Sequence, residues 1–208
     1  MAAESILLVE GEDDSKVVGN LLYAHGLDQT LQIKPQGGVS LLLRELPVWA
    51  KESELRRLGI VVDANSDPAP PWQSIRDTLI SMGYEAPTEM KPNGIVLATE
   101  DRPAIGIWLM PSNTSPGMLE DFVLSMIANT DPLLPRARTC VGEIPPEHRR
   151  FAPQHRSKAI VHTWFAWQEE PGKPMGAGFS RRYLDSRCEP AMAFIGWIRL
   201  LLQQGPSY

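Results

Sequence analysis

Short apolar runs alternate along the chain with segments that have helical periodicity. Residues 5–10 (SILLVE) have the pattern of a fully buried strand, because the run is short, continuously apolar and followed at once by charges and glycine. Residues 14–24 then carry apolar side chains at the helical spacing, and Gly26 follows the last of them. The N-terminal segment therefore predicts a buried strand followed by a helix.

The same alternation continues to about residue 130. It predicts strands at 31–35, 58–63 and 104–110. It also predicts a glycine turn followed by a helix over 37–51, and helices at 72–82 and 117–130. Because of Pro47, the residue at which the helix of 37–51 ends is not fixed by the pattern. Strands that alternate with helices of roughly ten to fifteen residues indicate βαβ units. The sequence therefore predicts an α/β fold with a mostly parallel, Rossmann-like central sheet flanked by helices.

Prolines become frequent after about residue 135, and the strand and helix pattern loosens there. Residues 157–168 (SKAIVHTWFAWQ) are interpreted as a helix, and residues 189–203 (EPAMAFIGWIRLLLQ) have clear helical spacing. The expected organisation is an α/β domain over 1–135 and a C-terminal helical extension over 136–208 that packs on the same domain.

Acidic residues follow the predicted strands at the points where those strands end. Glu10 closes the first strand, Asp63 closes a later one with Asn65 and Asp67 just beyond it, and Glu120 lies in the first turn of the helix after 104–110. Because parallel strands joined by right-handed crossovers deliver their carboxyl ends to one edge, we expect these side chains to converge.

A cluster of carboxylates without metal-spaced Cys or His favours Mg²⁺, Mn²⁺ or Ca²⁺ over zinc. A divalent cation would also keep neighbouring acids ionised that otherwise raise one another's pKa. The alternative is that single acids are solvated or cap the next helix, which would explain Asp14 and Glu120. Glu10 is less easily explained as a cap, because it precedes the predicted helix by four residues.

Composition excludes several classes of protein. Hydrophobic residues make up 43% and charged residues 22% of the chain, as in ordinary globular proteins. No apolar run is long enough to span a membrane, and the first residues lack the pattern of a secretory signal, so we expect a cytoplasmic protein that does not bind membranes. Cys140 and Cys188 are expected to be free thiols rather than zinc ligands.

The net charge of −5 argues against a surface that binds phosphate everywhere, but it leaves room for a local basic groove. The tract 148–158 (HRRFAPQHRSK) contains three Arg and one Lys without an acid. It fits either a nucleic-acid contact or a solvated loop.

The motifs "LLVEGEDD" and, later, "IVVDANSD" resemble the Toprim domain of topoisomerases, primases, recombination nucleases and the overcoming-lysogenization-defect (OLD) nucleases. Glu10 and Gly11 match the family's glutamate and glycine after its first strand, and Asp63 matches the first acid of its DxD motif. The resemblance covers about residues 5–130, and the later "GMLEDF" and "SKAIVHTW" are similar to a small stand-alone Toprim-like family of bacterial proteins.

This resemblance implies roles for individual residues. Glu10 would be a metal ligand or a general acid/base, Asp63 a primary Mg²⁺ ligand, and Asp14 and Glu120 further acidic ligands of the OLD type. Lys158 would correspond to a late catalytic lysine that stabilises charge on a phosphate, with a solvated lysine as the alternative.

One departure concerns the second acid of DxD, which is Asn65 in this chain. Its carbonyl oxygen is still a ligand, and Asp67 can substitute for the missing acid. Weaker metal binding or a single-metal site is the expected result.

The leading hypothesis is a Mg²⁺- or Mn²⁺-dependent phosphodiester hydrolase that acts on DNA or RNA. The alternative is a non-catalytic Toprim-like module that binds metal or nucleotide as a partner in a defence or repair complex, and the oligomeric state, including a homodimer, stays open. A topoisomerase is disfavoured because no tyrosine has a supporting context.

The aromatic residues are interpreted mainly as core residues. Four tryptophans in apolar surroundings are expected to be buried: Trp108, Trp164, Trp167 and Trp197. Trp72, which follows a proline-rich stretch near Asp67, is kept as a candidate substrate contact, and residues 110–117 as either a phosphate-facing loop or an ordinary one.

Overall fold

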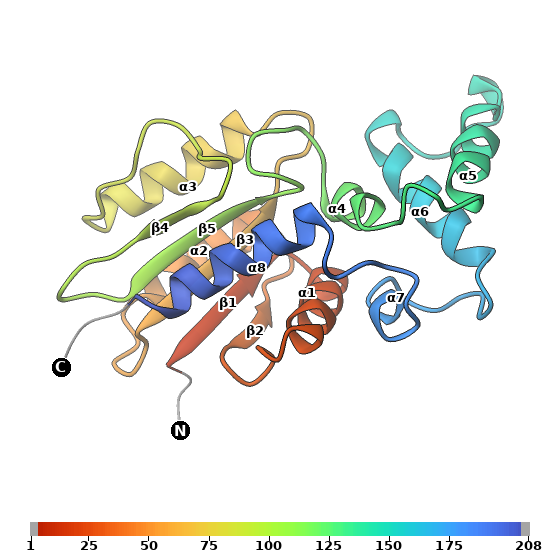
Figure 1. Ribbon diagram of the computed structural model, residues 1–208. Coiled ribbons are helices and arrows are strands. Elements are labelled where there is room, and N and C mark those ends of the chain that lie inside the picture. Colours follow the sequence, from red (N-terminus) through yellow and green to blue (C-terminus); the bar gives the residue numbers. More distant parts are fainter. Residues whose placement is uncertain (1–3, 205–208) are drawn as a thin grey trace.

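A computed structural model describes residues 4–204 and has a five-stranded sheet at its centre (Figure 1). The strands are β1 (Ser5–Val9), β2 (Gln32–Pro35), β3 (Arg57–Asp63), β4 (Ile95–Leu97) and β5 (Ala104–Met110). Their order in the sheet is β2-β1-β3-β5-β4, and every neighbouring pair is parallel except β4 and β5. The predicted α/β fold with a mostly parallel sheet is confirmed.

The helices are α1 (Glu12–Ala24), α2 (Val39–Trp49), α3 (Ala69–Ser81), α4 (Leu119–Ser125), α5 (Leu133–Gly142), α6 (Arg156–Ala166), α7 (Ala177–Ser180) and α8 (Glu189–Leu202), with short 3₁₀ turns at Pro146–His148 and Pro153–His155. Helix α2 continues through Pro47 to Trp49. Helix α5 was not predicted from the proline-rich sequence, but Pro135 lies in its first turn, where a missing amide costs no helical hydrogen bond.

The sheet separates two apolar clusters, which explains why its inner strands are apolar on both faces. Along β1, Leu7 and Val9 face the cluster on the α1 and α8 side, while Ile6 and Leu8 face the cluster on the α2 and α3 side. The central strands are therefore buried on both faces, and their polar neighbours collect at the strand ends.

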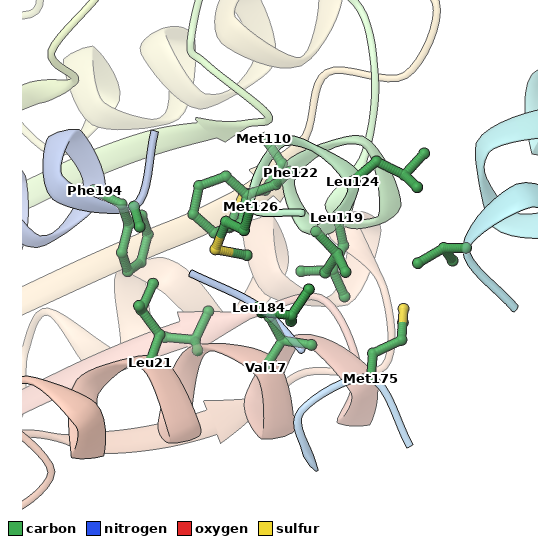
Figure 2. Packing of buried hydrophobic residues seen from close by; sticks show 14 of the residues in the cluster. Val17, Leu21, Met110, Leu119, Phe122, Leu124, Met126, Met175, Leu184 and Phe194 are labelled. Atoms are coloured by element: carbon green, nitrogen blue, oxygen red, sulfur yellow. The ribbon is translucent and has the colours of Figure 1, made fainter. Parts of the chain in front are cut away.

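The cluster on the α1 side joins the sheet to the later part of the chain. Figure 2 shows Val17 of α1 and Leu119 of α4 packed near Met175 and Leu184, which come from the segment between α6 and α8. Residues of α5 and α6, such as Val141 and Trp164, belong to the same cluster. Side chains from before and after residue 135 thus share one core.

One tryptophan does not lie in the core, where the sequence pattern placed it. Trp108, Trp164 and Trp197 are buried as expected, but Trp167 is 41% exposed because it follows the last residue of α6 instead of facing the core. Ile80 and Met192 are also exposed. Each lies beside the buried stripe of its helix, since a helical position turns by roughly 100° per residue.

No helix among residues 4–204 combines the length and apolarity that crossing a bilayer requires. Cys140 and Cys188 are free cysteines, as expected from their spacing.

Two glycines opposite each other in the sheet allow α8 to lie close to it. Gly59 of β3 pairs in register with Gly106 of β5, and a Cβ atom at Gly106 would lie 3.0 Å from both Leu201 Cδ2 and Trp197 Cζ2. Because backbone is all that the sheet presents at these positions, the α8 side chains pack directly against it.

We expect Gly106→Val to destabilise the protein by roughly 1–3 kcal/mol, because overpacking a filled core forces side chains off their rotamers. The measurement is the free energy of unfolding in urea. Gly196→Ala in α8 is the control: a Cβ atom there meets open space, and removing a glycine from a helix interior should stabilise the fold by about 0.5–1 kcal/mol. Equal effects of the two substitutions would contradict this account.

Candidate functional site

The carboxyl ends of β1 and β3 bring Glu10 and Asp63 side by side. The strands are adjacent and parallel, and Asp63 is the last residue of β3. The amide of Asp63 donates a hydrogen bond of 2.8 Å to Oε1 of Glu10. The expected meeting of these two distant acids at one sheet edge is therefore observed.

The backbone around Glu10 is fixed by the turn that precedes α2. The amides of Gly37 and Gly38 both donate to the carbonyl oxygen of Glu10, at 2.9 Å each. Both glycines have positive φ angles, of 77° and 118°, which other residues rarely adopt. This glycine turn therefore fixes the backbone from which the Glu10 carboxylate extends.

Asp14 reaches the same edge from the first turn of α1. Its Oδ2 accepts a hydrogen bond of 3.1 Å from the amide of Gly11 and so caps the helix. Its other oxygen, Oδ1, is buried and has no hydrogen-bond partner among the described residues. Helix capping therefore accounts for only one of the two carboxylate oxygens of Asp14.

Asp63 connects the end of β3 to the start of α4. Its Oδ1 accepts a hydrogen bond of 2.9 Å from the amide of Leu119, the first residue of that helix. Glu120, the next residue, is also buried, at 3% exposure. The hydrogen bond between Asp63 and Leu119 thus holds the end of β3, which carries Asp63, next to the start of α4, which carries Glu120.

Burial and mutual repulsion raise the pKa values of these acids. Desolvation by burial is the largest cause for Asp63, followed by the charges of Asp14 and Glu10, and together they raise its pKa to about 8. Burial, followed by the charge of Glu10, raises the pKa of Asp14 to about 6. Burial also raises the pKa of Glu10, against the opposing effect of backbone amides. The carboxyl groups are therefore close enough to hinder one another's ionisation.

Lys158 of α6 forms an ion pair with Glu120, with 3.0 Å between Nζ and Oε1. The lysine side chain is half-exposed, while that of Glu120 is buried. The hydrogen bond to Glu120 is the main cause that raises the pKa of Lys158. The lysine that the sequence singled out thus lies beside the acids and keeps a solvent-accessible cation at this edge.

Asn65 and Asp67 have other partners. The backbone of Asn65 exchanges two hydrogen bonds of 2.7 Å with Gly117, and its side-chain amide donates to the carbonyl of Asp63 at 3.4 Å. The Oδ1 atom of Asp67 accepts a hydrogen bond of 2.9 Å from the amide of Ala69, the first residue of α3. Asp67 is exposed, and this bond to the amide two residues on is an Asx turn that leads into α3.

One contact between α4 and α6 was not predicted from the sequence. The hydroxyl of Ser157 donates to Oδ1 of Asp121, whose Oδ2 in turn accepts from the amide of Met118 at 2.9 Å. A serine in a basic tract has no sequence pattern that marks it as such a contact. Ser157 and Lys158 together fasten the start of α6 to the start of α4.

The donor set is suited to a hard divalent cation. Within residues 4–204, no three His, Cys, Asp or Glu side chains form a ready-made metal cage. Mg²⁺ does not need one, because it keeps several waters and is commonly held by one or two carboxylates together with substrate phosphates. The unpartnered Oδ1 of Asp14 and the raised pKa values of Asp14 and Asp63 are what such an ion would relieve.

Comparison with known proteins gives a family and a fold. A family model described as "Protein of unknown function (DUF3226)" matches residues 4–203. The C-terminal region of the Xanthomonas campestris pv. campestris OLD protein, phased with iodine, is similar in structure, with a TM-score of 0.51 and 11% identity over 97% of this chain and 96% of that chain. A platinum-phased structure of the same region has a TM-score of 0.42 at 11% identity, covering 97% and 91%. No curated protein matches the chain.

The raised pKa of Asp63 predicts how stability depends on pH in the metal-free protein. Between its ordinary pKa of 3.8 and its value of about 8, the folded state binds more protons than the unfolded state, so the free energy of unfolding falls as pH rises. Asp63→Asn, which keeps an acceptor for Leu119, removes this dependence, so its stability relative to wild type should rise by roughly 2 kcal/mol between pH 5 and pH 8, since coupled neighbours take up part of the effect.

The measurement is urea unfolding in EDTA at both pH values. Asp67→Asn is the matched control, because Asp67 is exposed and an asparagine also forms an Asx turn, so it should leave stability unchanged at both pH values. A stability of Asp63→Asn relative to wild type that does not rise between pH 5 and pH 8 would contradict the interpretation of a repulsive cluster.

Proposed function

We propose that this chain, which belongs to the family described as "Protein of unknown function (DUF3226)", is a Toprim-like, Mg²⁺- or Mn²⁺-dependent phosphodiester hydrolase acting on DNA or RNA. The observation that carries the proposal is the juxtaposition of Glu10, Asp14 and Asp63, three carboxylates whose ionisation is hindered by burial and by one another. The similarity in fold to the C-terminal region of an OLD protein supports the choice of this class.

Glu10, Asp14 and Asp63 are the candidate ligands, one or two of which would hold the cation together with a substrate phosphate, with Glu120 nearby. Each of the first three is attached to the main chain at a strand end or in a first helical turn, so the acids are in position before any ion arrives. When bound, the ion would polarise a phosphate oxygen and lower the pKa of a water. Asn65 adds no charge, and Asp67 already accepts the amide of Ala69, so we assign the main ligand role to the other acids.

Two side chains of the chain itself would act on the substrate. Glu10, whose pKa is raised by burial, is the candidate general acid or base, because a raised pKa brings the proton exchange of a carboxyl closer to neutral pH. Lys158 is half-exposed beside the acids and would place its ammonium against charge that develops on a phosphate oxygen. Its bond to Glu120 aims the lysine side chain toward the site.

The direct test is nicking and degradation of plasmid and single-stranded DNA and RNA, with Mg²⁺ or Mn²⁺. We expect Glu10→Gln and Asp63→Asn to lower metal-dependent cleavage by at least about a hundredfold, because each removes a charge that holds the ion or moves a proton. Asp67→Asn, a change of the same kind at the exposed Asx turn before α3, should leave the rate within about twofold of wild type. Cleavage that persists in the first two variants would refute the assignment.

A specific observation favours a second function, a non-catalytic module that binds metal or nucleotide. The position of a second acid is taken by Asn65, and each of the three carboxylates already accepts a backbone amide. Calorimetric titration with Mn²⁺ separates the two functions. Binding that depends on Asp63, without cleavage of any nucleic acid, would support the module.

Lys158 gives a test that separates chemistry from ion binding. Lys158→Met should lower the cleavage rate roughly a hundredfold, the effect of removing one charged stabiliser of a transition state. The same change should tighten Mn²⁺ binding, since it removes a cation from the edge of an acidic cluster. Lys51→Met, at an exposed lysine after α2, is the control and should change neither. Weaker Mn²⁺ binding in Lys158→Met would indicate a structural role for the lysine.

A further inference from the structure

A pocket of about 330 Å³ lies beside the acidic edge. Its walls come from the start of α3, the segment before β4 and the loop after β5. The volume is near the lower end of the roughly 300–1,000 Å³ of small-molecule sites, so it suits one ring-sized group.

The pocket shares two loops with the acids. Pro68 and Ala69 follow the β3 loop that begins at Asp63, and Asn113 and Thr114 belong to the loop after Met110. Met110 is the register partner of Asp63 in the sheet. Pro68 is five positions after Asp63, a span of at most about 18 Å even in a fully extended chain, so pocket and acids are within reach of a few successive nucleotides of one strand.

The chemistry of the walls favours a neutral, flat group. Pro68, Ala69, Trp72 and Met90 contribute apolar surface, and among the described residues that line the pocket none is Lys, Arg or His. Glu89 is the one charged residue of the lining, and it would repel a phosphate. A phosphate group is therefore a poor occupant, whereas an uncharged aromatic ring with amino groups fits these walls.

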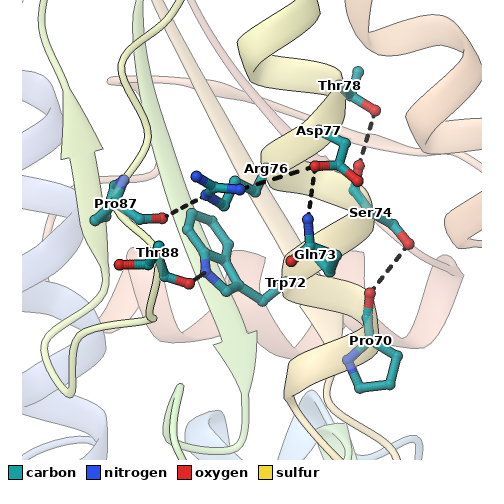
Figure 3. A network of polar contacts seen from close by, with 9 residues as sticks. All are labelled: Pro70, Trp72, Gln73, Ser74, Arg76, Asp77, Thr78, Pro87 and Thr88. Atoms are coloured by element: carbon teal, nitrogen blue, oxygen red, sulfur yellow. Dashed lines mark hydrogen bonds and ion pairs between the residues drawn. The ribbon is translucent and has the colours of Figure 1, made fainter.

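Trp72 belongs to the core cluster on the α2 and α3 side and is 4% exposed, so only a small part of its indole reaches the pocket, and that part is fixed in place. Figure 3 shows its indole between α3 and the segment before β4, where Nε1 donates a hydrogen bond of 3.0 Å to the carbonyl of Thr88. Arg76, one turn along α3, donates to the carbonyl of Pro87 at 3.0 Å. These two bonds hold the segment against α3, so the pocket exists before any ligand enters and little ordering is needed on binding.

We propose that this pocket takes a nucleobase of the substrate strand, next to the phosphate that is bound at the acids. The position of the phosphate at the acids rests on the proposed function, whereas the pocket and its walls do not depend on it. A base can enter only when it is unstacked, so the preferred substrate is single-stranded nucleic acid or a frayed end rather than an intact duplex. Thr88 and Thr114 at the pocket offer hydroxyls, and Glu89 offers an acceptor for an exocyclic amino group.

The experiment compares binding of a short single-stranded DNA oligomer, the same oligomer with abasic residues throughout, and its duplex. Affinities are measured by fluorescence anisotropy of a terminal label, with Ca²⁺ present and with unlabelled competitors to remove any effect of the dye. We expect wild type to bind the base-containing strand about tenfold more tightly than either the abasic strand or the duplex, the order of magnitude of one base–aromatic contact.

Two variants fill the pocket from exposed positions, so their folding is not at risk. Ala69→Leu and Thr114→Leu should each abolish the preference for bases, leaving the affinity for the abasic strand unchanged. Ser115→Leu, the same kind of change on the same loop but outside the pocket lining, should keep the tenfold preference.

Equal affinities of wild type for the base-containing and abasic strands, including no binding of either, would overturn the proposal, as would an equal loss in Ser115→Leu. Cleavage is measured separately. Retained base preference in a protein that cleaves nothing would reject the hydrolase while supporting the pocket. Cleavage without base preference would reject the pocket while supporting the hydrolase.

Discussion

The hydrogen bond from the Asp63 amide to the Glu10 carboxylate defines the edge around which the acidic site is built. It exists because β1 and β3 are parallel neighbours whose carboxyl ends stop side by side, and it holds an acid from one strand against the backbone of the next. Each further acid is fixed in a similar way, Asp14 by the amide of Gly11 and Asp63 by that of Leu119. Main-chain donors thus hold together buried carboxylates that repel one another, and burial, followed by this repulsion, raises the pKa values of Asp14 and Asp63.

The same arrangement connects the last third of the chain to the site. Asp63 accepts a hydrogen bond from the start of α4. Helix α4 in turn contacts α6 twice, through the ion pair of Glu120 with Lys158 and the hydrogen bond between Asp121 and Ser157. Two successive contacts, from Asp63 to α4 and from α4 to α6, therefore connect the edge of the sheet to the part of the chain that follows residue 135. The apolar cluster shared by α1, α4 and α6 makes this connection rigid, since buried side chains at native packing density transmit displacement to their neighbours.

The sequence predicts those features that depend on local periodicity. The parallel strands are short apolar runs, and α1, α3 and α8 have helical spacing, so element order and fold class follow from the sequence. It does not predict β4, which has three residues, or α5, which begins among prolines. Both depend on tertiary partners: β4 on the antiparallel edge of β5, and α5 on its packing in the α1-side cluster.

For the site, the strand ends and the rule for parallel sheets are enough to bring Glu10 and Asp63 together. The family resemblance suggested Glu120 and Lys158 as site residues but not their ion pair, and the contact of Ser157 with Asp121 had no indication in the sequence. The hydrogen bond of Asp67 to the amide of Ala69 also follows local rules, because an Asp side chain commonly accepts from the amide two residues on in an Asx turn. Sequence reasoning thus finds acids more easily than it divides them between structural and chemical roles.

Asn65 illustrates the difference between a structural and a chemical role at the site. Its φ angle of 55° is left-handed, a conformation that Asn tolerates better than most residues, and its backbone joins the β3 loop to Gly117 in the loop after β5. An aspartate at this position would supply one more ligand, but it would add charge near a carboxyl whose pKa is already raised to about 8. The amide keeps the turn and the link between the two loops without increasing the repulsion. These are also the loops that form the pocket, so Asn65 serves the architecture that the acids and the pocket have in common.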